Sequence, residues 1–241
     1  MQLFFSNHIS GTEGVLSEEE TRHCISVLRK QQGDSIDIVD GRGNRYHAVI
    51  TKAGKHSCEF SITDRIVLKP FNALKIHLAI APTKNAERME WLLEKAIETG
   101  ISEVSFIQCE HSEKNRVNMV RMEKIAIAAM KQSGQPFLQL IHDLQPFSDC
   151  ISSVQPGIKL IAHCHNAFVR VPLHTQLGSM ASEHITIFIG PEGDFSEKEI
   201  QLAESLGYKG ISMGGSRLRT ETAGLFAVVM LNGSVAAFPG Q

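Results

Sequence analysis

The sequence has 241 residues, of which 42% are hydrophobic and 21% are charged, and its formal net charge is −2. This composition excludes a disordered or fibrous chain, and at roughly 100 to 200 residues per domain the length predicts two domains, one small and one of medium size. With 24 Lys and Arg against 26 Asp and Glu, the overall charge gives no sign of a nucleic-acid partner, so such a partner would need a local basic patch.

Residues 1–72 predict a small β-barrel domain. Apolar and polar residues alternate over residues 35–40, 45–52 and 57–68, as in half-buried strands, and glycine-containing turns lie between these segments. A short helix is expected over residues 17–30. Ser17 and Glu20 have the spacing of a capping box, in which Ser17 accepts from the amide of Glu20 and the Glu20 carboxylate reaches back.

Residues 73–241 predict an α/β domain, because strand-like and helix-like segments alternate there. The expected strands are residues 75–81, 104–108, 139–142, 159–163, 184–189 and 210–212. The expected helices are residues 86–99, 117–133, 146–153 and 197–206, followed by a last apolar helix that ends at Phe238. This order is typical of an open, doubly wound parallel sheet that binds ligands at the carboxyl ends of its strands.

The five cysteines are scattered without a C-x-x-C pair, and the amino terminus lacks a basic segment followed by an apolar one. We therefore expect a reduced, cytoplasmic protein. No apolar stretch approaches the roughly 18 to 20 residues that cross a bilayer, so no membrane partner is expected.

A glycine-rich turn follows the buried strand at residues 184–189. Gly190 and Gly193 let the backbone approach a ligand closely, and Ser196 with Glu199 has the spacing of a second capping box. The turn lacks the lysine and the third glycine of the common phosphate-binding and dinucleotide-binding motifs. A tight strand-to-helix turn without a ligand explains the pattern equally well.

A second loop, residues 212–224, places Arg217, Arg219 and Glu221 between two glycines and the start of the last helix, where Thr220 or Thr222 can act as a cap. The amides and the positive dipole end of such a helix favour an anion or a carboxylate. A solvated loop with a structural pair of arginine and glutamate is the alternative interpretation.

His163, Cys164 and His165 form the one group that suggests zinc. Their spacing differs from that of zinc sites, and alternation explains them as part of a strand. We therefore expect no metal.

Together the two loops resemble a known family. The segments 190–193, 206–207 and 218–223 look like the carboxy-terminal motifs of the SPOUT class of methyltransferases, specifically the RsmE family of 16S ribosomal RNA (uracil-N3) methyltransferases. The PUA-like domain of that family is matched by His23 and residues 27–29, 33–34 and 40–41. Its middle part is matched by Lys84, residues 95–96, Gly100 and residues 132–133. The resemblance covers nearly the whole chain.

The resemblance implies an α/β fold with a SPOUT-type parallel sheet and a carboxy-terminal trefoil knot in residues 73–241, after a PUA-like β-barrel domain for RNA binding in residues 1–72. It also implies a homodimer that binds S-adenosyl-L-methionine. Carried over, the residues of the cofactor pocket would be Gly190, Glu192, Gly193, Met213, Gly214, Leu218, Arg219, Thr222 and Ala223.

Four positions depart from the family pattern. The amino terminus lacks an early arginine, Thr99 stands where leucine is common, and Gln135 stands where arginine is common. Asp194 replaces a frequent glycine, which would change the turn or lie outside it.

The resemblance implies methyl transfer to N3 of a uracil, with 16S ribosomal RNA or the assembled small ribosomal subunit as partner. The uracil must lose its N3 proton, so its anion needs stabilisation and the proton needs an acceptor. Arg219 is the expected stabilising group, and Glu221 or Glu192 is the expected proton acceptor.

Local basic patches would hold the RNA. Residues 111–135 contain five Lys and Arg against two acidic residues, although a solvated helix face explains this excess as well. The expected RNA contacts are Arg22, Arg29, Lys84, Lys114, Arg116 and Arg121.

Two other functions remain open. A SPOUT enzyme that methylates the ribose 2′-oxygen would share the fold, and a non-catalytic RNA-binding ribosome factor would keep the basic patch. The PUA-like segments favour the uracil enzyme, and the intact loop motifs favour catalysis over binding alone.

Overall fold

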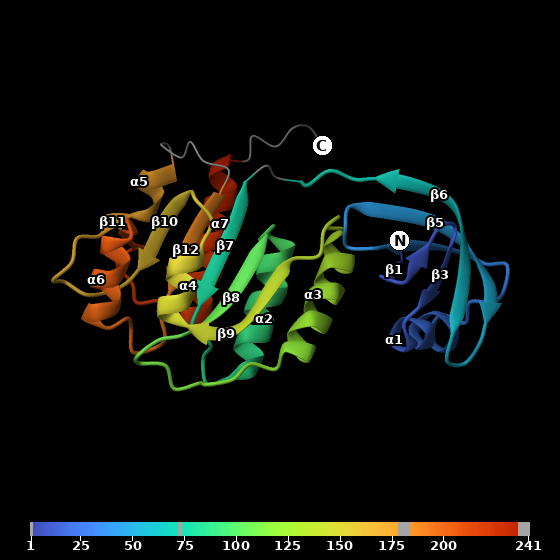
Figure 1. Cartoon of the computed structure of the whole chain (residues 1–241), viewed down its shortest axis with the longest axis horizontal. Helices are drawn as coiled ribbons and strands as arrows, with labels where there is room; N and C mark the ends of the chain where they lie inside the picture. The colour runs from blue at the N-terminus through green and yellow to red at the C-terminus, as the bar shows by residue number, and fades with distance from the viewer. Residues whose placement is uncertain (1, 72–73, 178–183, 236–241) are drawn as a thin grey trace. The chain divides into compact units, whose positions relative to one another are not determined.

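The computed structural model describes residues 2–71, 74–177 and 184–235 (Figure 1). Contacts divide the chain into two compact units, Met1–Phe71 with Ile127–Leu138, and Asn72–Ala126 with Gln139–Gln241. The predicted boundary between residues 72 and 73 lies outside the described residues and stays a prediction. The second half of helix α3 (Met119–Ser133) groups with the first unit, which the sequence did not indicate.

A six-stranded sheet forms the first unit. Its strand order is β1-β4-β5-β6-β3-β2, and Phe4, Ile38, Ile50 and Phe60 lie fully buried in its core. The strands are β1 (Leu3–Phe5), β2 (Ile9–Ser10), β3 (Glu13–Leu16), β4 (Ser35–Val39), β5 (Asn44–Ala53) and β6 (Cys58–Val67). The predictions for β4, β5 and β6 are confirmed, whereas β1 to β3 were missed because strands of two to four residues carry almost no periodicity.

The predicted helix of the first unit is shorter than expected and has two parts. Helix α1 (Glu18–Thr21) continues as a π-helix, η1 (Arg22–Val27), and Ser17 Oγ accepts from the amide of Glu20 at 3.3 Å. The other half of the capping box was predicted wrongly. The Glu20 carboxylate instead accepts from the amide of Phe5 at 3.3 Å and pairs with the ammonium group of Lys131. A buried carboxylate takes the cation in preference to a local amide, because an unpaired buried charge is costly.

A seven-stranded parallel sheet forms the second unit, in the order β11-β13-β10-β12-β7-β8-β9, which confirms the predicted α/β class. Its strands are β7 (Lys75–Ile80), β8 (Glu103–Gln108), β9 (Leu140–Pro146), β10 (Ile158–Ala162), β11 (Val171–Pro172), β12 (His184–Ile189) and β13 (Lys209–Ser212). The short strand β11 was missed.

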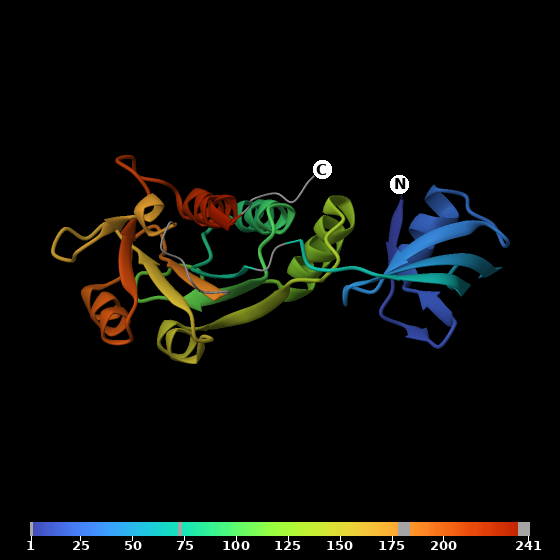
Figure 2. The same cartoon turned by 90° about the horizontal axis from the view of Figure 1, so that it is seen from above.

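Helices cover both faces of this sheet. Figure 2 shows α2 and α7 side by side on one face and α4 with α6 on the other. The helices are α2 (Ala86–Glu98), α4 (Phe147–Ser153), α5 (Leu173–Leu177), α6 (Glu197–Ser205) and α7 (Thr220–Val235). The predicted end of the last helix at Phe238 lies outside the described residues, and α5 was missed.

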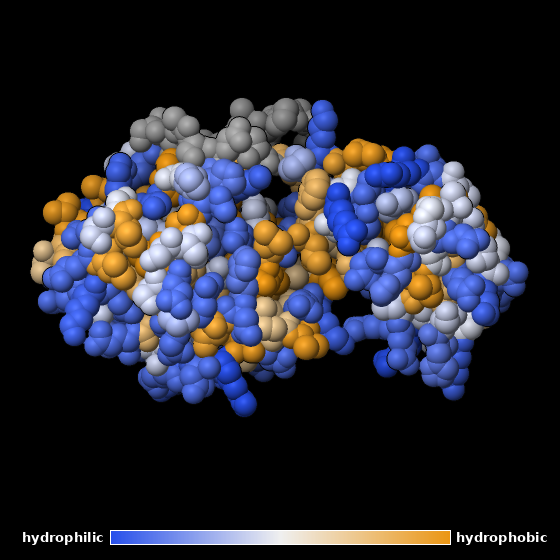
Figure 3. Space-filling model, in the orientation of Figure 1, coloured by the Kyte–Doolittle hydropathy of each residue, from blue (hydrophilic) through white to orange (hydrophobic). Residues whose placement is uncertain are grey.

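The central strands β7 and β12 are buried almost throughout, as expected of a parallel sheet covered on both faces. Helix α7 approaches them closely at Gly224, where an added Cβ would lie 2.9 Å from Cδ1 of Ile80. On the face in Figure 3, hydrophilic residues cover most of the surface and hydrophobic residues appear among them in small groups. No helix in the described part of the chain combines the length and the apolar character needed to cross a membrane.

Candidate functional site

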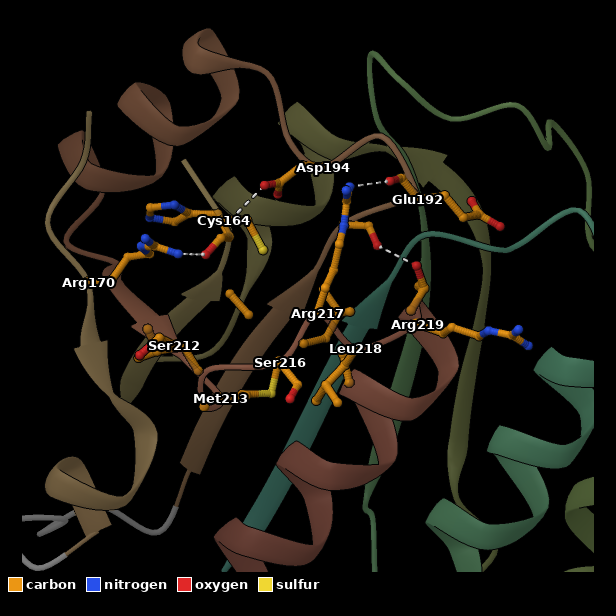
Figure 4. A pocket seen from close by; sticks show the side chains of 18 of the residues that line it. Cys164, Arg170, Glu192, Asp194, Ser212, Met213, Ser216, Arg217, Leu218 and Arg219 are labelled. Atoms are coloured by element: carbon orange, nitrogen blue, oxygen red, sulfur yellow. Dashed lines mark hydrogen bonds between the residues drawn. The ribbon is translucent and has the colours of Figure 1, made fainter. Parts of the chain in front are cut away.

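A cavity of about 340 Å³ lies at the carboxyl ends of β10, β12 and β13 (Figure 4). These strands end together, because Ala162 pairs with Ile189 on one side and with Ile211 on the other. The loops that follow the three strands therefore meet, and each contributes to the wall. The lining residues are Ala162, His163, Cys164, Arg170, Ile189, Gly190, Pro191, Glu192, Asp194, Ile211, Ser212, Met213, Gly214, Ser216, Arg217, Leu218, Arg219, Thr220 and Ala223.

Seven of the nine residues predicted for the cofactor pocket line this cavity, namely Gly190, Glu192, Met213, Gly214, Leu218, Arg219 and Ala223. Gly193 and Thr222 do not line it. An added Cβ on Gly193 would lie 3.0 Å from Cβ of His111, so this residue packs against the loop after β8. Thr222 is exposed on α7.

The turn after β12 is held by Asp194, which adopts a φ of +66°. Its Oδ2 accepts from the amide of Cys164 at 2.7 Å, and its Oδ1 accepts from the amide of Phe195 at 2.8 Å. Aspartate tolerates the left-handed region that glycine usually occupies. This departure from the family pattern therefore keeps the turn and adds a tether to the loop after β10.

The loop after β13 is tied to the same turn. Arg217 reaches the carbonyl oxygen of Glu192 at 3.3 Å, and the Thr220 hydroxyl donates to the carbonyl oxygen of Gly190 at 3.2 Å. Thr220 is the first residue of α7, and its hydroxyl links the start of this helix to the turn after β12. It therefore does not cap the helix, as the sequence suggested it could. Gly214 has a φ of +116°, which favours glycine at this bend.

Three arginines are among the residues that line the cavity, and their guanidinium groups differ in their partners. Arg170 donates to the carbonyl oxygen of His163 at 3.1 Å, and Arg217 donates to the carbonyl oxygen of Glu192. Arg219 has no side-chain partner among the residues that the structure describes, and its side chain points away from Cys164 and Met213 (Figure 4). Arg219 is therefore the guanidinium that remains available to a substrate.

The two predicted proton acceptors lie in different surroundings. Glu192 is exposed and lines the cavity. Glu221 is buried in α7, does not line the cavity, and pairs with Arg88 of α2 at 3.7 Å. The position of Glu221 therefore argues against its predicted catalytic role and for a structural one between two helices.

His163 is a cavity residue that the sequence interpretation placed in a strand. Strand β10 ends at Ala162, so His163, Cys164 and His165 lie in the loop after it. His163 is buried, and neither ring nitrogen has a hydrogen-bond partner among the residues that the structure describes. Such orphaned buried groups are rare and indicate a missing partner, such as a ligand or water. No three His, Cys, Asp or Glu side chains within the described residues are grouped to hold a metal ion.

Acidification should destabilise the fold through His163 and His77. Burial lowers the pKa of both imidazoles below the usual 6.5. The unfolded chain then binds more protons than the folded one, so the stability that these groups contribute is present above about pH 6.5 and is lost as pH falls through their folded pKa. Urea unfolding at pH 7.5 and pH 5 should show a smaller pH effect in His163→Gln and His77→Gln than in the wild type. An unchanged effect in both variants would contradict this assignment.

The six predicted RNA contacts fall into two groups. Lys84 pairs with Glu113, and Arg121 donates twice to Glu90 at 2.8 and 3.0 Å. The other four have no side-chain partner within the described residues: Lys114 and Arg116 in the second unit, and Arg22 and Arg29 in the first.

Two other departures from the family pattern have local structural roles. The Thr99 hydroxyl donates to the carbonyl oxygen of Lys95 at 2.8 Å at the end of α2. The side chain of Gln2, near the amino terminus that lacks an arginine, lies 3.4 Å from His23.

The cavity residues that lie outside the two predicted loops and the strands before them come from the end of β10 and the loop after it. Their only signal was their place after a predicted strand, since parallel strands present ligand-binding loops at their carboxyl ends. Which of the strands lie side by side cannot be read from periodicity. Ala162, His163, Cys164 and Arg170 therefore became site residues only through the strand order.

Comparisons with known proteins point to one family. Residues 70–232 match the model described as "RNA methyltransferase domain", and residues 16–63 match the model described as "RNA methyltransferase PUA domain". The protein of Mesomycoplasma hyopneumoniae named ribosomal RNA small subunit methyltransferase E is 31% identical over 232 residues, which cover 94% of this chain and 96% of that protein.

Solved structures agree over nearly the full length. The probable rRNA-methyltransferase from Porphyromonas gingivalis matches with a TM-score of 0.89 and 38% identity, over 99% of this chain and 100% of its own. A ribosomal RNA small subunit methyltransferase E from Neisseria gonorrhoeae, bound to S-adenosyl methionine, matches with a TM-score of 0.80 and 25% identity, over 97% of each chain.

Proposed function

The chain belongs to the family of the ribosomal RNA small subunit methyltransferases E, and from this premise we propose that it methylates N3 of a uracil in 16S ribosomal RNA. The family resemblance seen in the sequence is confirmed, and the protein is an RNA methyltransferase with a PUA domain that uses S-adenosylmethionine. The observation that carries the proposal is the cavity at the ends of β10, β12 and β13, whose lining includes Arg219, an arginine with no side-chain partner among the described residues.

The cavity fits this cofactor, which combines a flat base, a sugar and a charged amino-acid end. Ile189, Ile211 and Leu218 offer apolar surface. The neutral His163 offers one nitrogen donor and one acceptor that no other group in the described part of the chain satisfies. About 340 Å³ lies within the usual range of small-molecule sites, roughly 300 to 1,000 Å³. When bound, S-adenosylmethionine supplies a methyl group on a positively charged sulfur.

The residues of the chain prepare the uracil for attack. Arg219 donates hydrogen bonds to a uracil carbonyl oxygen and stabilises the negative charge that appears when N3 loses its proton. Glu192, exposed at the same cavity, accepts that proton directly or through water. Glu221 keeps α7 against α2 through Arg88 and has no part in the proton transfer.

The test is to incubate the protein with S-adenosylmethionine and small ribosomal subunits that lack modifications, and to locate the methyl group by mass spectrometry. A methyl group on N3 of a uracil is expected. One on a ribose 2′-oxygen would replace the proposal by the related ribose activity. Cofactor binding without any transfer would favour a non-catalytic ribosome factor.

We propose that the RNA is held by local basic groups on both units, Arg22 and Arg29 on the first and Lys114 and Arg116 on the second. Their lack of side-chain partners among the described residues supports this. Few phosphate contacts suit a structured target, the assembled small subunit, better than free RNA. The cytoplasm is then the compartment in which we expect the protein.

A trefoil knot in the second unit is also part of the proposal. Ala162 and Val171 pair with Ile211 from opposite sides, so residues 163–170 bridge across the path of β13. The bridge lies directly on β13, since a Cβ added at Gly210 would lie 2.5 Å from the carbonyl oxygen of Val169, and this close crossing supports a threaded chain. Stretching the chain from its two ends should give a fully extended length shorter than that of an unknotted chain, whereas the full length would exclude a knot.

A homodimer is supported by an apolar surface on two adjoining helices. Phe226 and Val229, three residues apart on α7, are 38% and 47% exposed, and Trp91 on α2 is 45% exposed. Large apolar side chains at neighbouring exposed positions mark association surfaces. Light scattering should give twice the 26.6 kDa of one chain, and a monomer at micromolar concentration would contradict the proposal.

A thiol reagent should modify Cys164 first in the native protein. The other four cysteines are buried, and burial raises the pKa of Cys150 to about 11. Because Cys164 lines the cavity, saturating S-adenosylhomocysteine should slow its modification at least tenfold. Mass spectrometry after timed alkylation, with Cys164→Ser as the control, measures both effects. Equal rates with and without the ligand would contradict the placement of the cofactor.

A further inference from the structure

A second cavity, of about 450 Å³, lies beside the cofactor cavity on the same edge of the sheet. The loop after β7 and the first turn of α2 form one wall, and the loop after β8 with the start of α3 forms the other. The two cavities share no lining residue. They therefore are separate sites.

The chain segments that lead into the two cavities are directly bonded. The amide of Ala81 donates to the carbonyl oxygen of Ile189 at 3.0 Å. The next residue after Ala81 is Pro82, in the second cavity, and the next residue after Ile189 is Gly190, in the first. The two cavities thus lie at the ends of two adjacent strands, β7 and β12.

The second cavity combines an apolar floor with two cationic side chains. Met89 and Met122 are 2% and 4% exposed and form buried apolar surface. Lys114 and Arg116 line the cavity and have no side-chain partner among the described residues, whereas the neighbouring Arg121 is held by Glu90. This combination suits a ligand with one flat apolar part and one anionic part.

A polar group on the wall adds hydrogen-bonding capacity. The side-chain oxygen of Asn118 accepts from the amide of Arg121 at 3.2 Å at the start of α3, which leaves its NH₂ group as a donor. A carbonyl oxygen of a nucleobase is a matching acceptor.

We infer that the second cavity binds a nucleotide of the RNA substrate that flanks the methylated uracil, with its base against Met89 and Met122 and its phosphate at Lys114 and Arg116. This inference rests on the proposed function, because that function brings an RNA strand to the first cavity. Sequence-specific RNA recognition works on unstacked single-stranded bases held in such pockets. The flanking nucleotide positions the strand, and the methylated one enters beside Arg219.

Filling the cavity tests the inference. Val117, in the loop before α3, lines it, and Val120, the second residue of α3, is 67% exposed and does not. Val117→Trp should weaken binding of the cofactor-loaded protein to unmodified small subunits about tenfold and raise KM for them equally, since the indole ring takes the space of the bound base. Val120→Trp should match the wild type, and both variants should bind S-adenosylmethionine normally.

A second pair of variants avoids any disturbance of packing. Arg116→Gln changes an exposed residue and should raise KM several-fold, whereas Lys209→Gln, at the opposite end of the sheet where β13 begins, should not. Equal subunit affinity in Val117→Trp and Val120→Trp, or a wild-type KM in Arg116→Gln, would overturn the inference. If the variants differ as expected but the methyl group is found on another atom, the proposed uracil-N3 activity is wrong and the inference about the second cavity stands.

Discussion

Replacing Arg219 with alanine should lower kcat for methyl transfer about 100- to 1,000-fold at saturating cofactor, the usual effect of removing one donor that stabilises a developing anion. The reason is that its guanidinium is not already bonded: of the three arginines that line the cavity, Arg170 and Arg217 each donate to a backbone carbonyl oxygen. Only the side chain of Arg219 has no partner to release within the described residues. Its charge is thus available when the uracil loses its proton.

The neighbouring Arg217 supplies the matched control. Arg217→Ala removes the bond to the carbonyl oxygen of Glu192 at 3.3 Å and loosens the turn, so it should weaken cofactor affinity several-fold and change kcat little. Arg219→Lys should recover only part of the lost rate, because an ammonium group cannot make the two parallel bonds of a guanidinium. Turnover of Arg219→Ala should also rise more steeply with pH than that of the wild type, since the uracil anion then forms without help.

Steady-state kinetics with unmodified small subunits and calorimetry with S-adenosylmethionine separate these effects. Near-normal kcat in Arg219→Ala would show that the anion is stabilised by another group. A loss of cofactor affinity as large as the loss of kcat would instead make Arg219 a binding residue.

Capping motifs in the sequence predict the structure correctly where both hydrogen-bond partners lie within a few residues of each other. The capping box of Ser196 and Glu199 is present with both of its bonds. The box at Ser17 is present only in half, because Glu20 is buried and finds Lys131, more than a hundred residues away in the chain. No pattern within four residues can indicate such a partner.

The same limit applies to the candidate site. The loops at residues 190–194 and 212–223 could be recognised because their glycines and arginines are close in sequence. His163 could not, since its role depends on β10 lying between β12 and β13. The alternation of apolar and polar residues predicts a strand that ends at His163. In the structure β10 ends one residue earlier, at Ala162, and His163 lines the cavity.

Asp194 is one of the positions at which the chain departs from the family pattern, and a substitution there should lower the stability of the fold strongly. Its carboxylate accepts from the amides of Cys164 and Phe195 at 2.7 and 2.8 Å. Hydrogen bonds to a charged group contribute ~1.5–3 kcal/mol each, so Asp194→Ala should lower the free energy of unfolding by about 3 kcal/mol or more. The alanine must also adopt the positive φ of +66°, which costs an additional ~1 kcal/mol.

Glycine and asparagine at this position separate the two causes. Asp194→Gly loses both bonds but accepts the positive φ without strain, so it should be about 1 kcal/mol more stable than Asp194→Ala. Asp194→Asn keeps an acceptor and the backbone preference and should be the mildest change. Urea unfolding should therefore rank the proteins as wild type, asparagine, glycine and alanine.

Cofactor affinity should follow a different order, because it depends on the tether to Cys164 and not on the strain. Asp194→Gly and Asp194→Ala lose that tether equally, so calorimetry should show the same weakening in both, about tenfold. A glycine variant that is as stable as the wild type would mean that the turn does not need the carboxylate. Unequal cofactor affinities in the glycine and alanine variants would mean that the backbone of the turn, rather than the loop after β10, positions the cofactor.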